Sequence, residues 1–187
     1  MKTVRIVQDL KAAIEVPHWA FHFYLKHFKI IAGLSLIPAV ERFILLFFEP
    51  DLSTTTLILL EIFTEGTRLL LLWLIIKFAI SQDRKLREVK KKERWRRVKS
   101  FVKYRWVNLI FQIILMFIAT LIFDFFLEQV IGNLIPDYFQ NKYIAILLAI
   151  KNPTVIAWFF VWLIGIPKQM MRFSSEESKK GIYVSII

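Results

Sequence analysis

Four long apolar runs are the feature that most constrains what this chain can fold into. A helix of about 20 apolar residues crosses a hydrocarbon core of about 30 Å, and each run is at least that long. Membrane strands alternate apolar and polar residues, whereas residues 69–76 are continuously apolar. The sequence therefore predicts an all-α, polytopic membrane protein. Its four transmembrane helices are expected at residues 28–48, 57–80, 106–131 and 143–166.

Composition agrees with this class. Of the 187 residues, 57% are hydrophobic, compared with about 45–50% in an ordinary soluble domain. Four crossings use nearly half of the chain, which leaves little for a second folded module. The chain has no cysteine, which excludes disulfides, thiolate metal sites and a cysteine nucleophile.

The fourth apolar run leaves one alternative open. Lys151, Asn152 and Pro153 interrupt it, and a run with such an interruption could lie in the membrane interface, giving three crossings instead of four. A proline inside a helix removes one N–H, here freeing the carbonyl of Ala149. We therefore expect a break in the fourth helix.

Cationic residues predict the orientation of the helices. Residues 1–29 hold five Lys and Arg, residues 81–105 hold twelve and residues 167–187 hold four, whereas residues 49–56 hold none and residues 132–142 hold one. Cytoplasmic loops carry the excess of Lys and Arg. Both termini and the central loop are therefore expected on the cytoplasmic side of the cell (inner) membrane.

The segments outside the apolar runs complete the expected domain organisation. Residues 1–27 form an interfacial segment, in which Val4, Val7, Leu10 and Ile14 recur at helical spacing and predict an amphipathic helix that Pro17 ends. Residues 28–166 form the transmembrane domain, which includes the central loop. Residues 167–187 form a cytoplasmic tail.

The central loop, residues 81–105, is strongly basic. It holds twelve cations and three acids, and no Gly or Pro, so a helical loop is expected. Attraction to the anionic leaflet and docking of an acidic cytoplasmic partner are both consistent with this composition. Nucleic acid is not an expected partner, because no nucleic-acid fold surrounds the loop. The candidate lipid- or partner-binding residues are Lys90, Lys91, Lys92, Arg94, Trp95, Arg96 and Arg97.

Ionisable residues inside the apolar runs are the second informative feature. Such residues are costly in hydrocarbon and usually face a bundle interior or a wet cavity. By depth they gather in the outer half of the bilayer, and their five acids outnumber their three bases. The candidate intramembrane polar cluster is Glu41, Arg42, Glu61, Glu65, Arg68, Asp124, Glu128, Lys151 and Asn152.

Three interpretations of this cluster stay open: an ion-pair network that fixes helix register, a cation or proton site, and a polar pocket for a ligand or another membrane protein. Possible pairings are Arg68 with Glu61 or Glu65, Arg42 with Asp124, and Lys151 with another acid. On the third helix, Asn108, Gln112, Thr120, Asp124 and Glu128 follow four-residue steps and could line a path across the membrane.

The chain lacks the motifs of an enzyme. It has three histidines, no phosphate-binding glycine loop and no nucleophile elbow. We therefore expect no catalysis, no cofactor and no metal. The leading hypothesis is a membrane sensor, immunity or adaptor component, which is a homo-oligomer or a subunit of a membrane complex. The alternative is an oligomeric channel or proton-coupled carrier lined by the third helix.

Overall fold

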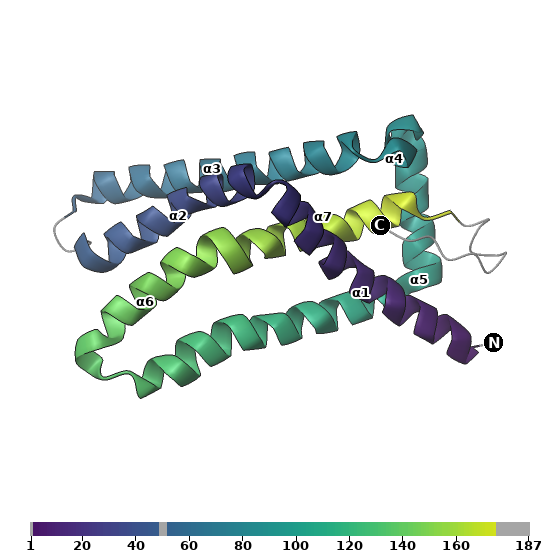
Figure 1. Cartoon of the computed structure of the whole chain (residues 1–187). Helices are drawn as coiled ribbons and strands as arrows, with labels where there is room; N and C mark the ends of the chain where they lie inside the picture. The colour runs from purple at the N-terminus through teal and green to yellow at the C-terminus, as the bar shows by residue number, and fades with distance from the viewer. Residues whose placement is uncertain (1, 49–51, 175–187) are drawn as a thin grey trace. The chain divides into compact units, whose positions relative to one another are not determined.

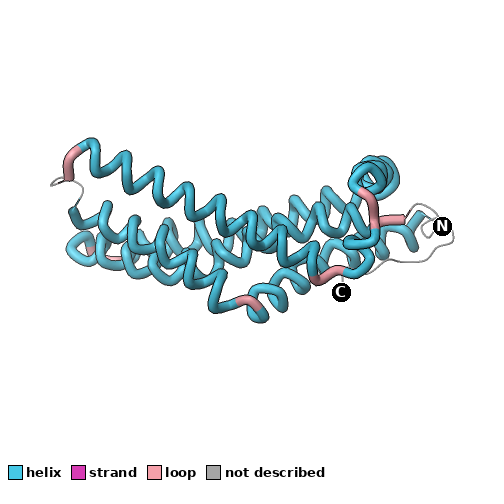
Figure 2. The backbone as a smooth tube through the Cα atoms, turned by 90° about the horizontal axis from the view of Figure 1, so that it is seen from above, coloured by secondary structure: helices cyan, strands magenta, loops and turns pink. Residues whose placement is uncertain are grey.

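The computed structural model describes residues 2–48 and 52–174, which form helices joined by short connections (Figures 1 and 2). The predicted all-α class is confirmed, since no strand occurs in this part of the chain. The helices are α1 (Lys2–Lys26), α2 (Phe28–Phe48), α3 (Thr54–Ser81), α4 (Arg84–Glu88), α5 (Lys91–Thr120), η2 (Leu121–Ile131), η3 (Gly132–Leu134), α6 (Asp137–Lys151), η4 (Asn152–Ile156) and α7 (Ala157–Arg172).

The chain divides into two compact units that interleave along the sequence. Unit 1 comprises residues 1–23, 74–117 and 161–187, and unit 2 comprises residues 24–73 and 118–160. Each unit therefore combines segments that are far apart in the chain. The predicted tail residues 175–187 lie outside the described part.

Unit 2 is built on the packing of α2 against α6 and η4. Its buried apolar side chains include Ile31 and Ala39 on α2, Leu71 on α3 and Ala145 on α6. The small side chains of Ala39 and Ala145 let helix backbones approach each other. The helices start at recognisable signals: the Ser53 hydroxyl accepts from the Thr56 N–H at the start of α3.

Unit 1 packs one face of α1 against α5 and α7. Ala13, Val16 and Ala20 on α1 are fully buried, as is Val161. The approach of α1 to α7 depends on Gly165, because a Cβ there would lie 2.7 Å from Val16 Cγ1 and 3.0 Å from the Trp19 ring. A glycine is required at this crossing because any larger residue would have to move one of these side chains.

Helix α1 corrects one prediction. Proline was expected to end the first helix at residue 17, but α1 continues through Pro17 to Lys26. The apolar residues Val7, Leu10 and Ile14 are exposed along it, as an amphipathic helix requires, while Asp9 is buried on another face. Proline has no N–H to donate to the carbonyl of Ala13, four residues earlier. Gln112 Nε2 of α5 donates to that carbonyl instead.

The fourth apolar run is also continuous where a break was expected. At Pro153 the helix widens into a π-helical turn, η4, and continues into α7. Side chains bind carbonyls in and before this turn: Asn152 Nδ2 donates to Leu148 O at 2.9 Å, and Tyr24 Oη donates to Pro153 O at 2.7 Å. A π-helical turn accommodates the missing proline N–H without unwinding the helix.

The basic loop is helical, as predicted, but bends. Helix α3 ends at Ser81 and the short α4 follows, capped by Asp83 Oδ1, which accepts from Leu86 N at 3.1 Å. Helix α5 then runs into the third apolar run with a kink at Arg105, where φ is −129° and ψ is 28° (Figure 1). The loop is therefore an ordered structure with fixed side-chain positions.

Within the described residues, two helical stretches are long and apolar enough to cross a membrane: Lys91–Leu134, which contains the kink at Arg105, and Asp137–Arg172. They contain the third and fourth predicted transmembrane helices. Helices α2 and α3 cover the first two predicted positions, and each carries charged residues along its length.

Candidate functional site

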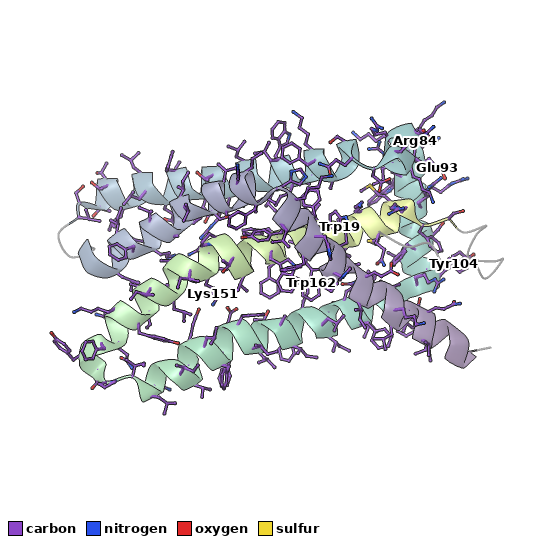
Figure 3. All side chains as sticks on the ribbon, viewed as in Figure 1. Trp19, Arg84, Glu93, Tyr104, Lys151 and Trp162 are labelled. Carbon is purple, nitrogen blue, oxygen red and sulfur yellow. The ribbon has the colours of Figure 1, made fainter. Side chains whose placement is uncertain are left out.

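Lys151 is the centre of the charged cluster in unit 2. Its side chain is buried, and its ammonium group forms ion pairs with both Asp124 and Glu128 of η2. Figure 3 shows the lysine reaching from α6 toward η2. One cation thus holds two carboxylates, both partly exposed, and the trio carries a net charge of −1 when all three groups are ionised.

A second pair lies along α3. Arg68 Nη1 donates to Glu65 Oε1, in an (i, i+3) ion pair whose carboxylate is more than half exposed. Asp124 pairs with Lys151 instead of the suggested Arg42. The charges of the candidate cluster therefore meet across helices at Lys151 and within one helix at Arg68.

The other cluster candidates are distributed over unit 2. Glu41 is buried on α2, whereas Arg42 and Glu61 are exposed. Asn152 is buried at the start of η4 and donates to the preceding turn. Glu41, Arg42 and Glu61 form no ion pair among the described residues, so the nine candidates do not make one continuous network.

A small cleft in unit 2 is lined by residues of four elements, α2, α3, η4 and the start of α7. Its empty volume is about 240 Å³, part of which is open space. Ser35, Arg68 and Asn152 provide polar groups, and apolar side chains form the other walls. The lining residues are Leu34, Ser35, Pro38, Thr67, Arg68, Leu71, Asn152, Ile156 and Phe160.

Unit 1 contains a buried polar network that the sequence analysis missed. Arg105 Nη1 donates to Asp9 Oδ1 at 2.6 Å, and Asn108 Nδ2 donates to Asp9 O at 2.9 Å. Gln112 Nε2 donates to Ala13 O at 2.9 Å, and Gln169 Nε2 donates to Ala12 O at 2.8 Å. These bonds attach α1 to α5 and α7, three of them through backbone carbonyls of α1 and one through the Asp9 carboxylate.

The predicted polar line on the third helix divides between two roles. Asn108 and Gln112 are fully buried and hold α1, and Gln112 Oε1 also accepts from Trp162 Nε1 at 2.9 Å. Trp162 lies on α7 (Figure 3). Thr120 is exposed, and Asp124 and Glu128 bind Lys151. Asn108 and Gln112 therefore make helix–helix contacts and do not line an open path.

Some cations of the basic loop bind within the loop. Arg94 donates from Nη2 to Leu86 O at 2.6 Å and from Nε to Val89 O at 3.0 Å, which satisfies carbonyls at the end of α4. Arg96 and Arg97 form ion pairs with Glu93, and the hydrogen bond from Arg96 lowers the pKa of Glu93. These three arginines therefore stabilise the helices of the loop through contacts within the loop.

The remaining loop candidates are available for binding. Lys90, Lys91 and Lys92 are exposed, and the Trp95 side chain is 62% exposed. Lys99 Nζ lies 5.8 Å from the centre of the Trp95 ring. We call Lys90, Lys91, Lys92, Trp95 and Lys99 the basic surface.

A second charged group joins the end of α7 to the start of α4. Asp83 Oδ2 lies 3.6 Å from both Lys168 Nζ and Arg172 Nε, and all three side chains are largely buried. Lys168 Nζ also lies 4.2 Å from the centre of the Trp19 ring. This contact fixes the cap residue of α4 and so the start of the basic loop.

Comparisons with known proteins add no assignment. Scans of protein-family models, curated proteins and solved structures each gave no match to this chain.

Proposed function

We propose that the chain is an integral membrane adaptor, of the sensor or immunity type, with four transmembrane helices and a cytoplasmic surface that docks an acidic partner or the anionic leaflet. In this proposal both termini and residues 81–105 face the cytoplasm, and the protein works as a homo-oligomer or as a subunit of a membrane complex. Catalysis is not part of it.

Exposed apolar surface supports the membrane assignment. Only 6% of the apolar window in Lys91–Leu134 is buried, and 28% of the window in Asp137–Arg172. A core helix of a soluble protein would be mostly buried, and a soluble monomer rarely exposes such large apolar patches. Ile113, Phe117 and Phe125 are each more than half exposed. Contact with lipid acyl chains removes the free-energy cost of exposing these apolar side chains to water.

The observation that carries the docking proposal is the basic surface. The three arginines that follow Lys92 bind the loop itself, so Lys90 just before α5 and Lys91, Lys92, Trp95 and Lys99 on α5 are left to face outward from an ordered backbone. An exposed tryptophan among lysines combines a large apolar contact with positive charge, which suits both an acidic protein surface and a headgroup layer.

The test uses the whole chain in nanodiscs of phosphatidylcholine, with two separate probes: polyglutamate and vesicles that contain phosphatidylserine. We expect the triple variant K90Q/K91Q/K92Q to weaken binding of at least one probe. Each cation near an anionic membrane contributes about 1 kcal/mol, so three correspond to about 3 kcal/mol, on the order of 100-fold.

The control variant is K11Q/K26Q/K29Q, which removes the same charge from exposed positions elsewhere. It should bind both probes within a few-fold of the unchanged protein. Equal loss in both triple variants would mean that net charge alone acts, and unaltered binding in the loop variant would overturn the docking proposal. The probe that responds identifies lipid or protein as the ligand.

One observation favours the alternative function, a channel or proton-coupled carrier. Two carboxylates share one lysine beside the π-helical turn, and partly exposed acids at that depth are typical of ion pathways. Proteoliposomes that pass protons or cations, with flux abolished by D124N, would support it. Absence of flux together with probe binding at the basic surface would favour the adaptor.

A further inference from the structure

We propose that the cleft in unit 2 binds the carboxylate head of a single-chain lipid, such as a free fatty acid, between Arg68 and Ser35. The proposal goes beyond the docking function, since it concerns residues of α2, α3, η4 and α7 and none of the basic surface. It rests on the membrane assignment, because the lipid would enter from the bilayer.

Ser35 is the first indication of a ligand. Its side chain is 3% exposed, it lines the cleft, and its Oγ has no hydrogen-bond partner among the described residues. Buried hydroxyl groups are nearly always hydrogen-bonded, because an unsatisfied one costs free energy. A ligand oxygen in the cleft would accept the hydrogen bond that the protein does not.

Arg68 supplies the charge that selects an anion. Its guanidinium group has five N–H donors. Glu65, the more exposed partner of the ion pair, accepts from one nitrogen, Nη1. Arginine binds carboxylates in a two-point geometry that lysine cannot reproduce. The remaining donors can therefore bind a second carboxylate at the cleft.

The walls of the cleft specify the rest of the ligand. Leu71, Ile156 and Phe160 provide an apolar lining, which favours a hydrocarbon chain next to the charged head. The cleft is small and partly open, so the head would lie against Arg68 and Ser35 while the first methylene groups extend over the apolar wall and out of the cleft. The rest of the chain would lie in the surrounding lipid, which favours one acyl chain over a bulky two-chain phospholipid.

The probe is a diazirine derivative of palmitic acid, cross-linked by light to the whole chain in phosphatidylcholine nanodiscs. We expect palmitate to compete with labelling and hexadecanol, which has the same chain but no charge, to compete at least 10-fold less well. Equal competition by hexadecanol would overturn the proposal. Mass spectrometry of the labelled peptides should place the label on α2, α3 or η4.

Variants separate binding from folding. R68Q should reduce labelling at least 10-fold and S35A about 3-fold, whereas R42Q, which removes an exposed arginine of α2 outside the cleft lining, should label normally. E65Q removes the competing carboxylate and should label as well as the unchanged protein or better. Weaker labelling of E65Q, at an unchanged melting temperature, would mean that Arg68 serves only the ion pair.

A misfolded R68Q would leave S35A and the hexadecanol comparison to decide. Normal labelling of a folded S35A would contradict the proposal. Since Lys90, Lys91 and Lys92 have no part in this assay, failure here leaves the docking function untouched, and failure of the docking test leaves the lipid site untouched.

Discussion

Gln112 binds the one carbonyl of α1 that Pro17 leaves without its helical donor. A residue at position 17 would normally donate to Ala13 O, but proline has no N–H. Gln112 Nε2 donates to this oxygen at 2.9 Å from α5. The proline and the glutamine, 95 positions apart in the chain, are thus two halves of one hydrogen-bonding arrangement.

This relationship predicts a coupling between the two residues. Q112L removes the donor to Ala13 O and the acceptor of the Trp162 Nε1 hydrogen bond, and an unsatisfied buried carbonyl costs about 1–3 kcal/mol. In a P17A background the backbone N–H of residue 17 can bind Ala13 O, so the same substitution should cost about 1 kcal/mol less. A double-mutant cycle of unfolding in mixed micelles measures the difference. Strict additivity would contradict the assignment.

The ion pair between Asp9 and Arg105 should be among the most sensitive contacts of unit 1. Both side chains are buried, and removing one partner of a buried pair costs about 3–5 kcal/mol. We expect D9N to lower the melting temperature strongly and to expose α1 to protease. E15Q is a suitable control, because it removes an acid from a less buried position of the same helix. Equal effects of the two variants would contradict this prediction.

Gly165 should not tolerate a side chain. A methyl group at this position would lie 2.7 Å from Val16 Cγ1, and overpacking of this kind costs about 1–3 kcal/mol. V16A removes the nearest obstructing atom, so G165A should be less harmful in that background. Gly33 is the control, since a Cβ there meets nothing within 4 Å. G33A should be neutral or stabilising, because alanine has the higher helix propensity. Equal unfolding midpoints of G33A and G165A would contradict the steric account of Gly165.

Lys151 should matter more for stability than either of its carboxylate partners. K151M leaves Asp124 and Glu128 next to each other without a cation, whereas D124N leaves Lys151 paired with Glu128. We expect D124N to cost less than half of the K151M effect, because the buried Lys151 keeps one carboxylate partner in D124N. The comparison is made by thermal unfolding. A larger effect of D124N would contradict the arrangement.

Residue patterns in the sequence predicted the helices and the polar residues that need a hydrogen-bond or ion-pair partner. They predicted only some of the pairs that form. The helical class follows from apolar run length, and α2 occupies the predicted residues 28–48. A proline in a helix frees the carbonyl four residues earlier, and this holds for Pro17 as it does for Pro153. The same rule would have predicted that Ala13 O needs a donor from outside α1, which Gln112 provides. The choice of partner for Asp124 depends on which helices pack together, and long-range packing leaves no local signal.

The network on α1 shows the same limit. Asn108 and Gln112 were recognised as polar residues in an apolar run, and such residues suit a pathway as well as a helix contact. Their partners are backbone carbonyls of α1, which every residue possesses, so composition carries no trace of the pairing. The exposed stripe of Val7, Leu10 and Ile14, in contrast, could be read from its spacing.

Cysteine accessibility tests the central claim, the four-crossing topology with a cytoplasmic basic surface, most directly. The chain has no cysteine, so single cysteines at Ser53, Ser100 and Gln140 each report one connection. We predict that a membrane-impermeant maleimide labels S53C and Q140C in intact cells and labels S100C only after permeabilisation. Labelling of S100C in intact cells, or protection of S53C and Q140C until permeabilisation, would contradict the account.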